Sequence, residues 1–389
     1  MHALPYWRLS GYYFFYFAFN GAFLPYFGLY LQSIRFSAWD IGVLMSLMQV
    51  MRLFGPSLWG WLADRSGRRA PIVRFAGLVS LLGFMAFFWL RDFAGMMLAM
   101  GMLAFFWSAA LPLVEALTFN HLREASGDYS RIRLWGSIGF ILAVLGTGAW
   151  LDHVAIDRLL WLSWLLLVGI FGVALTLPEA RPATHAGPAP SILGLLREKR
   201  VQALFLACFA MSAAHGAFYI FFSIHLTDHA YSNTQVGLLW SLGVVAEILV
   251  FMRMAPLLRR FSLRAILLAC FLAAVVRFVV IGWGVESAVL MIFAQILHGL
   301  TFGAYHASAI AAVNQWFPGR AQARGQALYS SVSFGAGGLV GGMISGWSWE
   351  ALGSPLTFGI SSGFALAGLL LIACGVGRGS DVTLAQPGR

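Results

Sequence analysis

Five ionisable side chains lie deep inside long apolar segments of this sequence: Arg52, His215, Glu247, Arg277 and His298. If these segments are membrane-spanning helices, a rise of about 1.5 Å per residue places all five near the middle of the bilayer. A charge there costs about 2.5–3.5 kcal/mol even on a lenient scale, so each is a functional candidate. Arginine can bind a carboxylate through two charge-assisted hydrogen bonds, whereas glutamate and histidine can carry a proton. These residue types therefore indicate anion recognition and proton movement.

The composition requires a membrane environment. Of the 389 residues, 60% are hydrophobic and 10% are charged, whereas about a quarter of the residues in soluble globular proteins are charged. The formal charge of +10 does not indicate nucleic-acid binding, because the basic residues lie mostly in short connections between apolar segments. Cys208, Cys270 and Cys374 lack metal-ligand spacing, so we expect neither a disulfide nor a metal site. No nucleophile motif or phosphate-binding loop indicates an enzyme.

Cuts at charges and at Pro/Gly clusters give apolar segments of roughly 20 residues, long enough to cross the hydrocarbon core as helices. Twelve segments result: 7–31, 38–62, 71–90, 93–120, 133–152, 158–177, 201–226, 235–254, 264–284, 287–316, 324–347 and 354–376. We therefore predict an all-α membrane protein with two six-helix bundles, at residues 1–180 and 201–389. The proline-rich stretch at residues 181–200 is the expected cytoplasmic linker.

The distribution of basic residues predicts the topology. With the N-terminus in the cytoplasm, twenty of the 25 Lys and Arg residues fall on the inner side and three on the outer side. This bias follows the positive-inside rule and is compatible with an even number of helices. We therefore expect a multi-pass protein of the cell inner membrane with both termini in the cytoplasm.

The two halves of the chain are related at a constant offset of 195 residues. Residues 17–52 and 212–247 share twelve identities in 36 positions, including Ser37 with Ser232 and NGAF with HGAF. Parallel repeats of this kind bind substrate and coupling ions near the bilayer midplane. Arg52 and Glu247 occupy equivalent positions with opposite charge, which favours directional, charge-coupled binding. A purely structural buried ion pair is the alternative interpretation.

Glu115 and Arg133 flank the connection between the fourth and fifth segments. We expect both to contact substrate, together with His215 and with Asn20 and Phe23 of the first segment. Alternatively, Arg133 is only a topology signal on the cytoplasmic side.

The connection between the second and third segments reads GWLADRSGRR. Gly60 permits close approach of helices, Asp64 can cap a helix end, and Gly67 permits a tight turn. The pattern resembles the loop between helices 2 and 3 in the major facilitator superfamily, and an ordinary basic loop is the alternative. The residues expected to form this conformational hinge are Gly60, Asp64, Arg65, Gly67 and Arg68.

Other positions resemble the lactose permease group of proton symporters. Glu115 lies eighteen residues before Arg133, and acidic and basic residues follow on the eighth to tenth segments. Two departures disfavour a sugar substrate: Thr301 stands where sugar symporters of the group have a carboxylate, and Phe140 stands where they have a sugar-stacking tryptophan.

The stretches SRIRLWGSIGF, WSLGVVAEI, VVRF and QILHGLTF are similar to the 3-phenylpropionate permease family in both halves of the chain. This resemblance implies the major facilitator fold and proton coupling, for which the candidate residues are Glu247, Arg277, His298 and His306. Glu247 is the first candidate for the proton carrier, because it is the one acidic residue clearly near the midplane.

The first and seventh segments are rich in aromatic residues, whereas amide side chains near the midplane are few. Rings and arginine together suit an apolar ring that bears a carboxylate. We therefore expect proton-coupled uptake of a small aromatic carboxylate by alternating access, with Arg52 as the first candidate for carboxylate recognition and Arg133 as the second.

Proton-coupled sugar or nucleoside transport is one alternative, and a non-transporting membrane receptor or scaffold of the same fold is another. The expected partners are a small-molecule substrate and the lipid bilayer, without nucleic acid; we expect a monomer that uses the proton as coupling ion and needs no cofactor.

Overall fold

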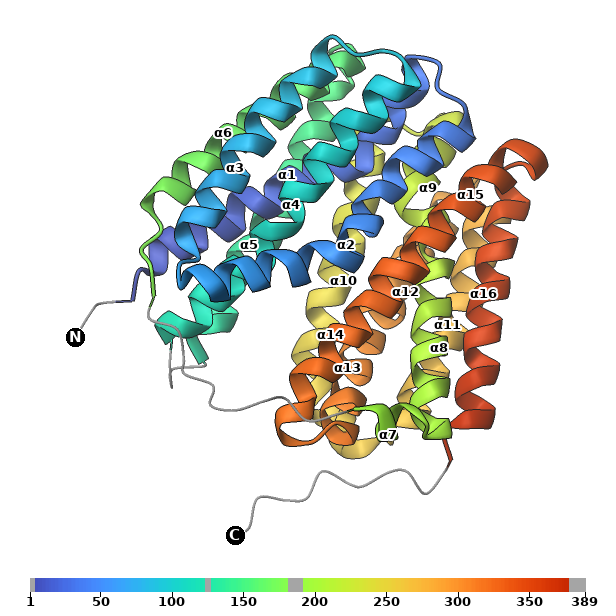
Figure 1. Ribbon diagram of the computed structural model, residues 1–389. Coiled ribbons are helices and arrows are strands. Elements are labelled where there is room, and N and C mark those ends of the chain that lie inside the picture. Colours follow the sequence, from blue (N-terminus) through green and yellow to red (C-terminus); the bar gives the residue numbers. More distant parts are fainter. Residues whose placement is uncertain (1–3, 123–126, 181–191, 378–389) are drawn as a thin grey trace. The chain divides into compact units, whose positions relative to one another are not determined.

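The computed structural model describes residues 4–122, 127–180 and 192–377, and its secondary structure there is helical (Figure 1). Twelve helical segments of this part are long and apolar enough to span a membrane, which confirms the predicted number. The predicted bounds differ most at two helix ends: the fifth segment begins at Gly127 rather than 133, and the eighth ends at Arg260 rather than 254. Both helices continue into polar sequence because backbone hydrogen bonding does not stop at the hydrocarbon boundary.

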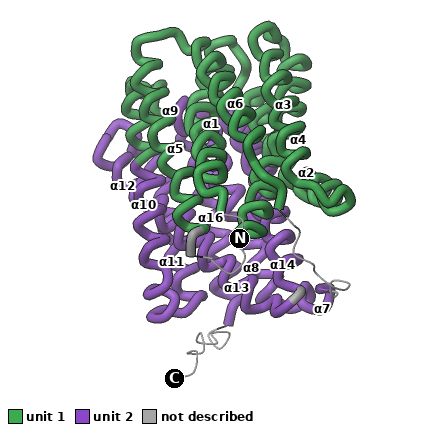
Figure 2. Tube along the Cα trace, turned by 90° about the vertical axis from the view of Figure 1, so that its left-hand side faces the viewer, with its two compact units in different colours: residues 1–186, 226–241 green, residues 187–225, 242–389 purple. Residues whose placement is uncertain are grey.

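The chain forms two compact units, shown in different colours in Figure 2. Unit 1 comprises residues 1–186 and 226–241, and unit 2 comprises residues 187–225 and 242–389. This division differs from the predicted one at residues 226–241, which pack with the first half. Most of the predicted linker, at residues 181–191, lies outside the described residues.

Unit 1 is built mainly from the first half of the chain. Its elements are α1 (Tyr6–Ser33), α2 (Ala38–Ser66), α3 (Ala70–Phe84), η1 (Met85–Phe88), α4 (Phe93–Leu122), α5 (Gly127–Leu151), η2 (Ile156–Arg158) and α6 (Leu159–Thr176). Helix α1 packs along α5 and α6, while α4 packs along α2 and α3. Close approach between α1 and α5 depends on Gly21 and Gly139, where an added Cβ would lie 2.5 Å from the Phe140 carbonyl oxygen and 2.3 Å from the Phe14 carbonyl oxygen.

Unit 2 contains most of the second half. Its elements are α7 (Leu193–Leu196), α8 (Lys199–Ala214), α11 (Leu263–Trp283), α12 (Ala288–His298), η3 (Gly299–Ala304), α13 (Tyr305–Trp316), η4 (Gly319–Ala321), α14 (Gln322–Ser330), η5 (Ser331–Gly337), α15 (Gly338–Leu352) and α16 (Ser354–Gly375). Helices α9 (Gly216–Asp228) and α10 (Asn233–Arg260) belong partly to each unit. Within unit 2, α16 packs along α8 and α11. The π-helical turns η3 and η5 interrupt two spans at glycine-containing sequence, which helical periodicity did not predict.

The predicted repeat appears in local hydrogen bonding as well as in sequence. Ser37 begins α2 with a capping box, in which its hydroxyl accepts from the Asp40 amide at 3.1 Å and its own amide donates to the Asp40 carboxylate at 3.2 Å. Ser232, the equivalent residue, makes the same reciprocal bonds with Gln235 before α10, at 3.2 and 2.9 Å. Each pair satisfies two helix-end donors, so the repeated serine defines where both helices start.

The predicted hinge loop is only partly as expected. Gly67 ends α2 with φ +64°, so the expected tight turn is present. Gly60 does not mediate close helix packing, because a Cβ there would have no atom within 4 Å. Asp64 lies within α2 and forms an ion pair with Arg69 at 3.4 Å instead of capping a helix. The backbone amides of Arg69 and Ala70, which have no acceptor within the helix at the start of α3, donate to the Glu179 carboxylate, both at 2.9 Å.

The start of α10 is held by the end of α5 within unit 1. The Asp152 carboxylate accepts from the Asn233 amide at 2.7 Å and from the Thr234 amide at 3.0 Å. Tyr26 of α1 donates to the Val144 carbonyl at 2.9 Å and to the Asn233 carbonyl at 3.2 Å. Burial alone would raise the pKa of the Asp152 carboxyl, but the hydrogen bonds from Thr234 and Asn233 outweigh it and lower that pKa below its ordinary value.

Asp152→Ala is expected to lower the free energy of unfolding by about 0.5–1 kcal/mol at neutral pH, since α10 loses an acceptor for its first amides. A carboxyl whose pKa is lowered by folding contributes stability above its unfolded pKa of about 3.9, and loses it as the pH falls through the folded value. The difference in melting temperature between wild type and variant should therefore shrink below about pH 4. Thermal unfolding in detergent measures this difference in melting temperature. Asp157→Ala, in the same connection, is the control. A difference that persists unchanged in acid would contradict this role.

Candidate functional site

Tyr16 interacts with several of the polar residues that the sequence predicted in unit 1. Its hydroxyl is within electrostatic range of Arg52, Glu115 and Arg133. Asn20, one turn further along α1, donates to the Tyr16 backbone carbonyl at 3.2 Å. Four residues predicted from separate helices therefore lie within electrostatic or hydrogen-bonding range of one tyrosine. The sequence did not single out Tyr16 from its aromatic neighbours, although its position four residues before Asn20 was an available signal.

The four residues around Tyr16 differ in their surroundings. Arg52 has an exposed side chain, whereas Asn20, Glu115 and Arg133 are partly buried. Glu115 accepts a hydrogen bond from the Tyr129 hydroxyl at 3.3 Å. The Arg133 guanidinium lies over the ring of Phe17, 3.9 Å from its centroid. The alternative that Arg133 only marks the cytoplasmic side is less suited to this contact, because a topology signal needs no ring partner.

Phe23 does not line a polar cluster. Its side chain is 0% exposed, and its ring stacks on those of Phe19 and Phe27 with centroids 5.0 and 4.2 Å away. Phe84 contacts it from α3. A substrate would have to displace this packed group of rings, so the structure gives Phe23 a packing role in unit 1.

Arg277 of α11 is fully buried in unit 2. Its Nε donates to the Ala294 carbonyl at 2.9 Å, and its Nη1 donates to His215 Nε2 at 3.2 Å and to the Thr301 hydroxyl at 3.3 Å. The guanidinium also lies over the ring of Phe218, 4.2 Å from the centroid. No carboxylate of the described residues lies within ion-pair distance of it. Arg277 is therefore a buried cation without an acidic counterpart in this part of the chain.

His215 is held in one tautomer by its two neighbours. It occupies the junction between α8 and α9, and its Nδ1 lies 2.8 Å from the Met211 carbonyl. A carbonyl only accepts, so Nδ1 carries the hydrogen and the lone pair on Nε2 accepts from Arg277. Neutral His215 therefore fixes the direction of the Arg277 guanidinium.

Several buried polar atoms near Arg277 have no hydrogen-bond partner among the described residues. They are Arg277 Nη2, His298 Nδ1, Gln295 Nε2 and Gln295 Oε1. Buried polar groups are nearly always hydrogen-bonded, so a concentration of exceptions requires a reason. Gln295 and His298 both lie against Gly243 of α10, where an added Cβ would be 3.2 Å from atoms of each. The sequence identified His298 and Arg277 but gave Gln295 no role.

A line of aromatic and histidine rings runs through the π-helical turn η3. His298 stacks on Phe302 with centroids 5.6 Å apart, and Phe302 stacks on His306 at 5.8 Å. His306 Nδ1 lies 2.8 Å from the Tyr329 hydroxyl. Glu247 approaches the same turn, since its Cγ lies 3.4 Å from the position of a Cβ at Gly303. All four predicted proton-coupling residues therefore lie in unit 2, on α10, α11, α12 and α13.

Residues 6–360 match the model of the MFS_1 like family. The chain belongs to this family. A probable 3-phenylpropionic acid transporter of Escherichia coli (strain K12) is 31% identical over 357 residues, which cover 89% of this chain and 92% of the relative. The maltose permease of Geobacillus stearothermophilus is 27% identical over 369 residues, 93% of each chain. The crystal structure of nucleoside transporter NupG superposes with a TM-score of 0.83 at 20% identity and covers 95% of this chain and 98% of that one.

These likenesses confirm the predicted fold and family. The chain is a secondary transporter of the major facilitator kind, a multi-pass membrane protein that handles a small molecule in a lipid bilayer. The family's members and its fold are those of transporters, not of enzymes.

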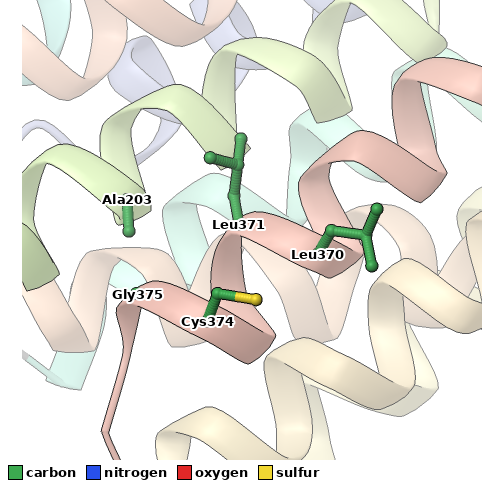
Figure 3. Close-up of a pocket in the computed structure, with 5 residues that line it drawn as sticks. All are labelled: Ala203, Leu370, Leu371, Cys374 and Gly375. Carbon is green, nitrogen blue, oxygen red and sulfur yellow. The ribbon is translucent and has the colours of Figure 1, made fainter.

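A groove of about 370 Å³ on unit 2 of this MFS_1-like transporter shares no lining residue with the polar groups around Tyr16 or Arg277. Figure 3 shows its lining residues, Ala203, Leu370, Leu371, Cys374 and Gly375, contributed by α8 and α16. None of them is charged, and none was predicted to bind substrate. An apolar surface of this kind on a membrane protein suits contact with lipid tails.

Proposed function

We propose that this transporter imports a small aromatic carboxylate together with protons by alternating access. The observation that carries the proposal is a guanidinium held against an aromatic ring in each unit: Arg133 over Phe17 and Arg277 over Phe218. A ligand with a ring and a carboxylate can use both kinds of group at once, through stacking and charge-assisted hydrogen bonds. Similarity to a probable 3-phenylpropionic acid transporter supports the same substrate class.

The proposal gives the predicted residues of each unit a part in transport. Asn20, Arg52, Glu115 and Arg133 contact substrate in unit 1. Glu247, with Arg277, His298 and His306, couples substrate to the proton in unit 2, and the proton is the coupling ion without a cofactor. The protein acts as a monomer in the cell inner membrane, with both termini in the cytoplasm.

Uptake by proteoliposomes tests this function directly. Labelled 3-phenylpropionate should accumulate several-fold when the outside is acidic, and a protonophore should abolish the accumulation. The neutral analogue 3-phenylpropanol should compete weakly, because it cannot pair with a guanidinium. Protein-free liposomes correct for passive entry of the protonated acid. Absence of gradient-driven uptake above that background would refute proton symport of this substrate class.

Proton-coupled sugar or nucleoside transport is the second candidate. Similarity to a maltose permease and structural likeness to a nucleoside transporter favour it. The same liposomes distinguish the two candidates. A sugar or nucleoside symporter would show gradient-driven uptake of maltose or a nucleoside and none of the aromatic acid. A receptor or scaffold of this fold would bind a ligand without moving any of these compounds.

A further inference from the structure

We infer that Arg277 forms the subsite for the substrate's carboxylate and that His215 is its positioning residue. This inference rests on the proposed function, since it assumes an anionic aromatic substrate. It gives Arg277 the substrate's carboxylate in addition to its place among the proton-coupling residues, whereas the sequence alone favoured Arg52.

The first argument is charge. Arg277 is 0% exposed, and none of the described carboxylates pairs with it. A buried charge is stabilised only when it is paired and hydrogen-bonded. A buried guanidinium without a carboxylate partner therefore strongly favours binding of an anion. Arg52 is exposed, so its charge is already accessible to solvent and gains less from a ligand carboxylate.

The second argument is geometry. Three of the guanidinium's hydrogen bonds are used by Ala294, His215 and Thr301, through Nε and Nη1. Nη2 is buried and has no partner in the described part of the chain. His215 accepts at Nε2 and is itself held by Met211, so it fixes Nη1 and leaves Nη2 for a ligand oxygen. His298 Nδ1 offers a further unpartnered polar atom in the same cluster.

The third argument is the surrounding rings. Phe218 and Phe278 lie 4.2 and 5.4 Å from the guanidinium carbon, measured to their centroids. Tyr219 and Phe302 border His215 and His298 and are partly exposed, so the cluster reaches the accessible surface of the chain. A carboxylate at Nη2 would place its own aromatic group among rings that can stack with it.

The test compares an acid with its neutral isostere. Calorimetry on the full chain in nanodiscs measures binding of 3-phenylpropionate and of 3-phenylpropanamide to wild type, Arg277→Gln and Arg277→Lys. Wild type should prefer the acid by about 30-fold, as expected for hydrogen bonds to charged groups, and Arg277→Gln should reduce the preference to about 3-fold or less. Arg277→Lys keeps the charge without the planar fork and should show an intermediate preference.

The matched control is Arg264→Gln on the same helix, whose guanidinium donates to the Ala373 carbonyl at 2.9 Å, away from the cluster. It should keep the wild-type preference. Thermal unfolding without ligand verifies that each variant is folded, and if Arg277→Gln is not, Arg277→Lys alone must show a reduced preference.

Four results would overturn the inference. Equal weakening of both ligands in the Arg277 variants would mean a structural role. A preference lost in Arg52→Gln and intact in Arg277→Gln would move the carboxylate to Arg52. If wild type binds no aromatic acid, the proposed function itself fails and the subsite with it, whereas tight acid binding that survives Arg277→Gln refutes the subsite alone.

Discussion

Glu247→Gln is expected to abolish proton-driven accumulation while exchange of labelled substrate across the membrane continues. Glutamine has nearly the same shape but cannot carry a proton, so the carrier still changes conformation with substrate bound. Glu247 is partly buried on α10, and its Cγ contacts the position of a Cβ at Gly303 in η3. It therefore lies beside the turn that connects His298 with His306. We expect the accumulation ratio under an imposed pH gradient to fall at least about tenfold, which corresponds to a typical coupling free energy.

Two assays on the same proteoliposomes separate coupling from transport. Counterflow exchange at equal pH reports movement of substrate, and uptake under an acidic-outside gradient reports coupling. Glu286→Gln, an exposed carboxylate between α11 and α12, is the matched control and should behave as wild type in both. Gradient-driven uptake by Glu247→Gln at the wild-type level would reassign the proton to the histidines or to Glu115.

Features that depend on short stretches of chain were predicted well from the sequence. The helical spans follow from the length of apolar sequence, because a backbone inside hydrocarbon must satisfy its own hydrogen bonds. Gly67 adopts φ +64°, as the predicted tight turn requires. Ser37 and Ser232 were aligned by the repeat, and both form capping boxes. The cost of a buried charge singled out Arg277, which is buried as expected.

Features that depend on contacts between distant segments were not predicted. Nothing near Asp64 indicated that Glu179, more than a hundred residues later, would accept from the amides that begin α3. Thr301 was noted only as a missing carboxylate, yet its hydroxyl accepts from Arg277. Phe23 was one of many rings in α1, and its burial depends on Phe84 of α3. Side-chain identity gives the chemistry that is available, but packing decides which groups meet.

The glycines of NGAF and HGAF show how the repeat and the packing are connected. Gly21 lies against α5, where an added Cβ would be 2.5 Å from the Phe140 carbonyl oxygen. Gly216 lies against α15, where an added Cβ would be 2.3 Å from the backbone carbon of Gly341. Neighbouring backbones cannot move aside as a flexible side chain can. Both units therefore use the same repeated glycine to bring two helices into close contact.

Gly216→Ala is accordingly expected to destabilise unit 2 by about 1–3 kcal/mol, because the new methyl group overpacks the contact between α9 and α15. Gly60→Ala is the matched control: a Cβ there meets no atom within 4 Å, and alanine favours a helix interior. Thermal unfolding in detergent should show a lower melting temperature for Gly216→Ala and an unchanged or higher one for Gly60→Ala. Gly21→Ala should resemble Gly216→Ala, since the Phe140 backbone is as close. Equal melting temperatures for the Gly216 and Gly60 variants would show that α9 and α15 can separate at little cost, and that the shared glycine reflects only the sequence repeat.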